Sequence, residues 1–174
     1  MRVAGKKRRS IDEGWFTGVY EHDGAFYAAE HYTGSIRVYE KTGGWKECRC
    51  IDLGCGSQNI TISIHDNMIY ACLLSDTKLM AYSLSGEQKR SWGNAGIGKA
   101  GELDVPYLCM TDAGGAALIA DSDNNRLQAL GANRQWSIVS LQPPVMEPMS
   151  ALFHCGRLFV TSFKDKRLYV YDPK

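Results

Sequence analysis

The sequence predicts an all-β protein, a β-propeller of four-stranded antiparallel blades with four blades in the 174-residue chain. The first observation is a stretch that occurs four times and aligns without a gap, with a period in the forties that is typical of propeller blades or helical arrays. The second is the pattern inside each copy: a turn, an apolar run, a polar turn, and a run that alternates apolar and polar residues. That pattern indicates a β-hairpin. The copies are anchored at Gly24, Asn67, Gly115 and Gly156.

The first strand of each predicted hairpin is almost continuously apolar, as expected of a strand with blades packed on both faces. The second strand keeps a period of two residues in every copy, with apolar residues in two columns. One column of the first strand contains Tyr27, Tyr70, Leu118 and Phe159, and the two columns of the second contain Ile36, Leu79, Leu127 and Leu168, and Val38, Ala81, Ala129 and Val170.

Two further strands complete each predicted repeat. A short apolar segment precedes every hairpin, and a more polar segment with an aromatic residue follows the first three, as an outer edge strand would. The preceding segments are residues 16–20, 60–64, 107–111 and 149–153, and the following ones lie around Trp45, Trp92 and Trp136.

The fourth repeat has no following segment, but the N-terminus resembles one. Residues 9–12 (Arg-Ser-Ile-Asp) are similar to residues 49–52 (Arg-Cys-Ile-Asp). We therefore expect the N-terminal strand to complete the last blade, which would cover an unpaired edge. The predicted organisation is one domain, residues 1–174, with blades at about 13–53, 57–93, 104–141, and 146–174 plus 5–12.

Composition excludes several classes of protein. With 44% hydrophobic and 22% charged residues the chain is typical of a globular protein. Its formal charge of +1 gives no global attraction to nucleic acid or anionic lipid. The basic N-terminus lacks a following apolar stretch, so we expect no secretory signal and no membrane anchor, and a cytoplasmic location. In that compartment the six cysteines are expected to be free thiols.

The third repeat carries a family motif. Residues 118–128 read Leu-Ile-Ala-Asp-Ser-Asp-Asn-Asn-Arg-Leu-Gln, and residues 98–106 form a Gly-rich connection that ends in Pro. Together they resemble the NHL repeat, whose propellers occur in tripartite-motif proteins. The fourth repeat keeps an Arg at 167, whereas the first two depart from the motif at the Asp and Arg positions.

The resemblance implies a structural role for the motif residues and a binding role for the domain. In NHL propellers the Asp and Arg tie the turn of the inner hairpin, so the structural residues here are Asp121, Asn124, Arg126 and Arg167. NHL propellers usually have six blades. Four blades either close alone or belong to a larger ring that another copy or chain completes.

No cofactor, metal or catalytic site is expected. Three histidines, His22, His65 and His154, occupy similar places in different repeats, which spreads them around a ring, and the cysteines between 48 and 55 have no second pair of zinc ligands. The alternative is a propeller hydrolase or lyase with a metal in the central channel. The column that would supply its ligands is Glu30, Leu73, Asp121 and Ser162, which is too apolar and uneven.

The predicted binding surface is the top face, where the inner hairpin turns meet the connections between blades. Exposed aromatic residues beside basic ones suit a protein or peptide partner, or single-stranded RNA as the alternative. Protein binding ranks first because the charge balance is near neutral. The candidate residues are Trp15, His31, Tyr32, Lys78, Asn124, Phe163, Lys164 and Lys166.

Overall fold

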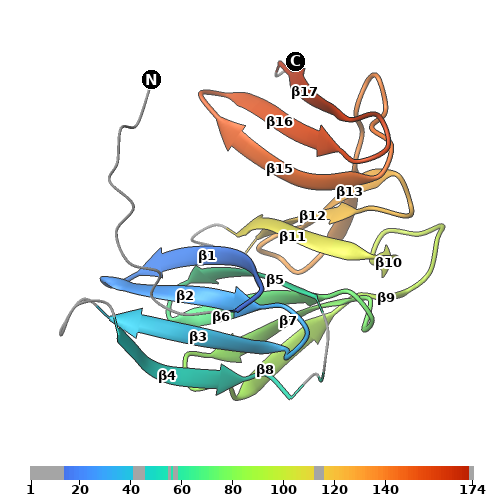
Figure 1. The fold of residues 1–174 in the computed structure, drawn as a ribbon. Coiled ribbons are helices and arrows are strands. Elements are labelled where there is room, and N and C mark those ends of the chain that lie inside the picture. Colours follow the sequence, from blue (N-terminus) through green and yellow to red (C-terminus); the bar gives the residue numbers. More distant parts are fainter. Residues whose placement is uncertain (1–13, 41–45, 55, 57–58, 112–115, 173–174) are drawn as a thin grey trace, which may run out of the picture.

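The structure is a computed structural model that describes residues 14–40, 46–54, 56, 59–111 and 116–172. Within these ranges the chain consists of strands and turns, without a helix. No described segment is therefore a helix able to cross a membrane. The strands form four small antiparallel sheets that follow one another in chain order, and these sheets are the blades of a four-bladed β-propeller (Figure 1).

The first two blades have four strands each. Each is a meander in which every strand pairs with the next. The first contains β1 (Phe16–His22), β2 (Ala25–Glu30), β3 (Ser35–Glu40) and β4 (Lys46–Asp52). The second contains β5 (Ile60–His65), β6 (Met68–Leu73), β7 (Lys78–Ser83) and β8 (Gln88–Trp92).

A short parallel pair, β9 (Asn94–Ala95) and β10 (Glu102–Leu103), lies in the connection to the third blade. The third blade again has four strands, and the fourth has three within the described residues. The third contains β11 (Pro106–Thr111), β12 (Ala117–Asp121), β13 (Arg126–Leu130) and β14 (Trp136–Val139). The fourth contains β15 (Pro148–His154), β16 (Arg157–Ser162) and β17 (Arg167–Tyr171).

The predicted fold class is confirmed. The four predicted first strands correspond to β1, β5, β11 and β15, each within two residues at either end. The predicted pairing of the N-terminal strand, residues 5–12, with the fourth blade and the outer strand residue Trp45 lie outside the described residues.

The core consists of three apolar layers, each between two successive blades. Alternation along the strands sends one side chain to the preceding blade and the next to the following blade. Val38 of the first blade thus shares a layer with Ile62 of the second. Ala81 shares the next layer with Leu108, and Leu118 shares the third with Val160.

The inner strands β1, β5, β11 and β15 line the centre of the molecule, and hydrogen bonds join them across blades. The Thr17 hydroxyl donates to the Ile60 carbonyl at 2.6 Å, and the Leu108 amide donates to the Thr61 hydroxyl at 2.7 Å. These bonds hold the first three inner strands at fixed spacing.

A repeated backbone hydrogen bond brings each inner hairpin turn to the residue that precedes the same blade's inner strand. The turn and the inter-blade connection therefore share one end of every blade, which we call the top face. The pairs are His31 N to Trp15 O (2.5 Å), Leu74 N to Asn59 O (3.3 Å), Ser122 N to Val105 O (3.4 Å) and Phe163 N to Glu147 O (3.0 Å).

Candidate functional site

Three of the predicted binding residues form one cluster on the first blade. Trp15, His31 and Tyr32, here called the first-blade rim, lie on the top face where β1 and the β2–β3 turn begin. The ring centroids of Trp15 and His31 are 6.4 Å apart, those of Trp15 and Tyr32 6.1 Å, and those of His31 and Tyr32 3.5 Å. Trp15 is 73% exposed and Tyr32 57%. Two large aromatic side chains are thus held together in solvent by mutual packing.

The backbone at Tyr32 is unusual. All four hairpin turns place a residue in the left-handed region at the same repeat position, namely Gly34, Thr77, Asn125 and Lys166. The first turn has an additional one, Tyr32, with φ of 70°. A bulky residue in this region is strained, and such strain is often found at binding sites. The extra left-handed residue distinguishes the first turn from the other three.

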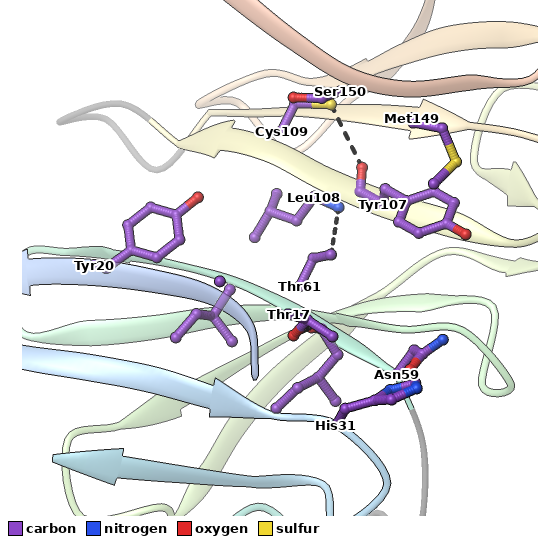
Figure 2. A pocket seen from close by; sticks show the side chains of 13 residues that line it. Thr17, Tyr20, His31, Asn59, Thr61, Tyr107, Leu108, Cys109, Met149 and Ser150 are labelled. Carbon is purple, nitrogen blue, oxygen red and sulfur yellow. Dashed lines mark hydrogen bonds between the residues drawn. The ribbon is translucent and has the colours of Figure 1, made fainter. Parts of the chain in front are cut away.

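A cavity of about 500 Å³ lies at the centre of the propeller and includes His31 in its wall (Figure 2). Residues of all four inner strands line it, among them Tyr20, Thr61, Cys109 and Ser150. The first-blade rim and the central cavity therefore share His31.

Two buried polar atoms in the cavity wall have no hydrogen-bond partner. They are Nδ1 of His31 and Oδ1 of Asn59. Leaving a buried polar atom unpaired is unfavourable by about 1 to 3 kcal/mol, and such atoms are rare in native structures. Both atoms are shielded from solvent, so a ligand group would donate to Asn59 Oδ1 only after displacing neighbouring atoms of the wall.

The cavity contains no activated nucleophile among its described residues. Burial raises the pKa of the Cys109 thiol to about 11, so the thiol is neutral at physiological pH. Burial likewise raises the pKa of Tyr20 and of Tyr107. The thiol and both phenols therefore present neutral groups to a bound molecule.

The NHL-like motif of the third blade forms a closed polar network. Asp121 is completely buried, and its carboxylate accepts hydrogen bonds from Arg126 Nε at 2.8 Å, from Gln128 Nε2 at 2.8 Å and from the Asp104 amide at 2.7 Å. Asn124 Nδ2 donates to the same carboxylate at 2.9 Å and to the Gly96 carbonyl at 2.9 Å. These residues fix the turn to the inter-blade connection.

Arg126 also orders the Gly-rich connection that the sequence analysis singles out. Its guanidinium donates to the carbonyls of Gly98, Lys99 and Glu102 at 2.8 to 3.3 Å. The Glu102 carboxylate in turn accepts from the Gly98 and Lys99 amides, and these two bonds lower its pKa. These hydrogen bonds fix the connection in place, so it is a structural loop.

The first blade also fixes its hairpin turn with a carboxylate network, but it uses different residues. A comparison of equivalent sequence positions does not find them. Glu30, in the column of Asp121, accepts from Arg37, which lies in the column of Gln128. Thr33 and Ser35 donate to the other carboxylate oxygen at 3.0 and 3.1 Å. The Arg37 hydrogen bond is the main cause that lowers the pKa of Glu30.

These two networks argue against the alternative of a metal ion in the central channel. The carboxylates of Glu30 and Asp121 are both engaged by arginine, so neither is available as a ligand in the channel. The described residues contain no group of three or more His, Cys, Asp or Glu side chains that could hold a metal ion.

The other predicted residues are distributed over the remaining blades. Lys78 is half-buried at the start of β7, and Asn124 belongs to the Asp121 network. Phe163 is exposed in the fourth turn, near Lys164, whose Nζ lies 4.0 Å from a carboxylate oxygen of Glu147. Lys166 and Arg167 are exposed.

Asn59 is the cavity residue that the sequence analysis does not single out. It precedes β5 as Trp15 precedes β1, and both supply the carbonyl that accepts the turn amide. A column drawn through the residues before the inner strands would have pointed to it.

Comparison with known proteins shows the fold. No protein-family profile matches the chain, and no curated protein sequence matches it. Among solved structures, the computationally designed Ika4 protein has 13% identity and a TM-score of 0.63, with 98% of this chain and 99% of that chain covered. Streptogramin B lyase has 14% identity and a TM-score of 0.62, covering 94% and 56%. A structure of the nidogen/laminin complex has 14% identity and a TM-score of 0.62, covering 86% and 55%. The chain thus spans about half the length of the last two.

Proposed function

We propose that this chain is a non-catalytic, NHL-like binding propeller that recruits a protein partner through the first-blade rim. The observation that carries the proposal is the exposed pair Trp15 and Tyr32, packed on His31 and held by a turn with an extra left-handed residue. Tryptophan and tyrosine are enriched among residues that dominate binding energy in protein interfaces. Large aromatic side chains that are already ordered lose little conformational entropy when a partner binds to them.

The cavity behind the rim supports a peptide ligand. His31 belongs both to the exposed aromatic cluster and to the cavity wall, so a side chain that is inserted beside it and displaces the atoms covering Asn59 Oδ1 would donate to that oxygen. Peptide side chains that end in an amide, a hydroxyl or an indole N–H supply the required donor.

Electrostatics favour protein over RNA. The lysines of the fourth turn, Lys164 and Lys166, flank Asp165. The pKa of Asp165 is lowered, first by the hydrogen bond from Tyr169 and also by the one from Ser162. This carboxylate is charged at physiological pH and would repel a phosphate backbone. Lys164 also lies near Glu147.

The comparisons include proteins of both kinds, an enzyme by its name, streptogramin B lyase, and a component of the nidogen/laminin complex. Our choice of a binding role therefore depends on the site itself. The thiol and phenols of the cavity are neutral, the carboxylates of Glu30 and Asp121 are bound by arginine, and the described residues contain no group of three metal ligands.

The test uses peptides as the probe. A random peptide library is selected on the immobilised 174-residue chain, and the affinities of the selected peptides are measured for the Trp15→Ala and Tyr32→Ala variants. We expect Trp15→Ala to weaken binding about 30-fold, which corresponds to about 2 kcal/mol. Ile138→Ala, which truncates an exposed side chain of the outer strand β14, is the control and should leave affinity unchanged. Peptides that bind the Trp15→Ala variant equally well would refute the assignment.

A parallel titration with a randomised single-stranded RNA tests the alternative. For RNA, log affinity should fall with log salt by about 0.7 for each phosphate contact. Sequence-selective RNA binding at physiological salt that is lost when Lys164 and Lys166 are replaced together would favour the alternative over the proposal.

A further inference from the structure

The two ends of the blade array present apolar faces that no other blade covers. Figure 1 shows the first and the fourth blade at the two ends of an arc. In a closed ring β1 and β15 would pack as β1 packs on β5, and the described residues show no such packing. Each end face is therefore defined by comparison with the three interfaces inside the array.

The fourth blade carries the residues of an interior interface. The column Ile36, Leu79 and Leu127 faces the following blade and is completely buried in the first three blades, but its fourth member, Leu168, is 60% exposed. In the next column, Val38 is fully buried and Val170 is 49% exposed. The cross-strand pairs place Leu152 and Phe159 on the same face as Val170.

The first blade shows the complementary anomaly. The column that faces the preceding blade contains Ile62, Leu108 and Ala151, all buried against a neighbour. Its first member, Val19, is 64% exposed. The exposed face of the first blade is therefore of the kind that a fourth blade would cover.

We propose that two copies of this chain join end to end, the fourth blade of each packing on the first blade of the other, and close one ring of eight blades. The new joints continue the three interfaces already present, because they bring together the same two kinds of column. The arc also has a suitable curvature: 91% of this chain superposes on 46% of the computationally designed Ika8 protein, and 92% superposes on 47% of BamB from Moraxella catarrhalis, so a second arc of equal length completes the circle. A two-fold arrangement of this kind is the commonest symmetry of soluble oligomers.

The two blade faces that each copy contributes are large enough for a stable dimer interface. A blade face of three or four strands, about six residues long and ~4.8 Å apart, measures roughly 350 Å². Each copy contributes two such faces, about 700 Å², which is near the ≈800 Å² per partner of a standard stable interface. Exposed apolar patches of this extent commonly mark interaction sites.

The experiment is sedimentation equilibrium of the 174-residue chain over a range of micromolar concentrations. We expect a species of twice 19.3 kDa. Val170→Lys and Val19→Lys should each give the mass of one copy with unchanged circular dichroism, because both side chains are exposed within a single copy. Ile97→Lys, which places the same charge at an exposed apolar residue away from both end faces, should keep the double mass. If Val170→Lys loses its circular dichroism signal, Val170→Ser provides the milder variant for the same measurement.

Mixing two variants tests the head-to-tail geometry. A ring of one Val170→Lys copy and one Val19→Glu copy has one unsubstituted joint and one joint that brings Lys and Glu together, so the mixture should regain the double mass. A wild-type mass of 19.3 kDa, a mass that grows beyond two copies, or a double mass that survives both end-face substitutions would overturn the proposal. Because no peptide is involved, this outcome is independent of the proposed function.

Discussion

The inner hairpin turns of the first and third blades occupy equivalent places in the repeat and both contain a carboxylate network, but only the first also carries exposed aromatic rings and a buried nitrogen without a partner. In the third turn Asp121, Asn124 and Arg126 satisfy one another and the adjacent connection. In the first turn Tyr32 is exposed beside the exposed Trp15 that precedes β1, and His31 keeps a buried nitrogen without a partner. A turn whose groups are internally satisfied stabilises the scaffold, whereas one with exposed rings and an unpaired atom is suited to a ligand.

The largest expected effect is in the third turn. Asp121→Ala would leave Arg126 and Gln128 without their common acceptor in a buried place, and breaking a buried ion pair from one side typically destabilises a protein by about 3 to 5 kcal/mol. Urea denaturation measures the loss. Asp123→Ala, an exposed neighbour in the same turn, should change the free energy of unfolding by less than about 0.5 kcal/mol. Equal effects of the two substitutions would contradict a scaffold role for the network.

The Glu30–Arg37 pair of the first blade gives a smaller, pH-dependent effect. Arg37→Met should reduce stability at neutral pH by about 1 to 2 kcal/mol, since it leaves a largely buried carboxylate with fewer donors. The pKa of Glu30 is lowered from 4.5 in the folded state, so the pair stabilises the fold above pH 4.5 and the contribution is lost as pH falls through the folded-state pKa. The stability curves of wild type and variant, measured against pH, should therefore converge in acid. A difference that persists at low pH would show that Arg37 acts by packing.

Replacing Tyr32 with glycine should change the free energy of unfolding and the peptide affinity in opposite directions. Glycine adopts a φ of 70° without strain, so Tyr32→Gly should raise the free energy of unfolding by about 0.5 to 1 kcal/mol while weakening peptide binding. Tyr32→Ala, which keeps the Cβ atom, should weaken binding without that gain. Thermal denaturation and peptide titration of both variants separate the two effects, and a Tyr32→Gly protein that is less stable than the Tyr32→Ala protein would exclude strain at this position.

The sequence predicts the blades well because their determinants are local. A period in the forties, continuous apolar runs and strict alternation specify each hairpin, and the observed strands follow them. The candidate site is less predictable. Arg37 replaces the motif arginine from a different column, which comparison at equal positions cannot detect. His31 and Asn59 line one cavity from different blades, and the exposure of Leu168 depends on whether a neighbouring blade is present.

The smallest effect concerns the cavity thiol. With a pKa of about 11, Cys109 is on the order of 0.1% thiolate at pH 8, so iodoacetamide should modify it far more slowly than the exposed Cys155. Peptide mass spectrometry of the native protein, with the unfolded protein as control, measures the two rates. Equally fast labelling of both cysteines in the native protein would show that the cavity does not shield the thiol.

Hydrogen exchange with and without a selected peptide tests the central claim most directly. The account predicts that bound peptide slows amide exchange in residues 14–16 and 31–34, which form the first-blade rim, and leaves residues 122–126 of the third turn unchanged because their network is already closed. Protection confined to the third turn, or to residues 163–167 of the fourth, would contradict the assignment of binding to the first blade.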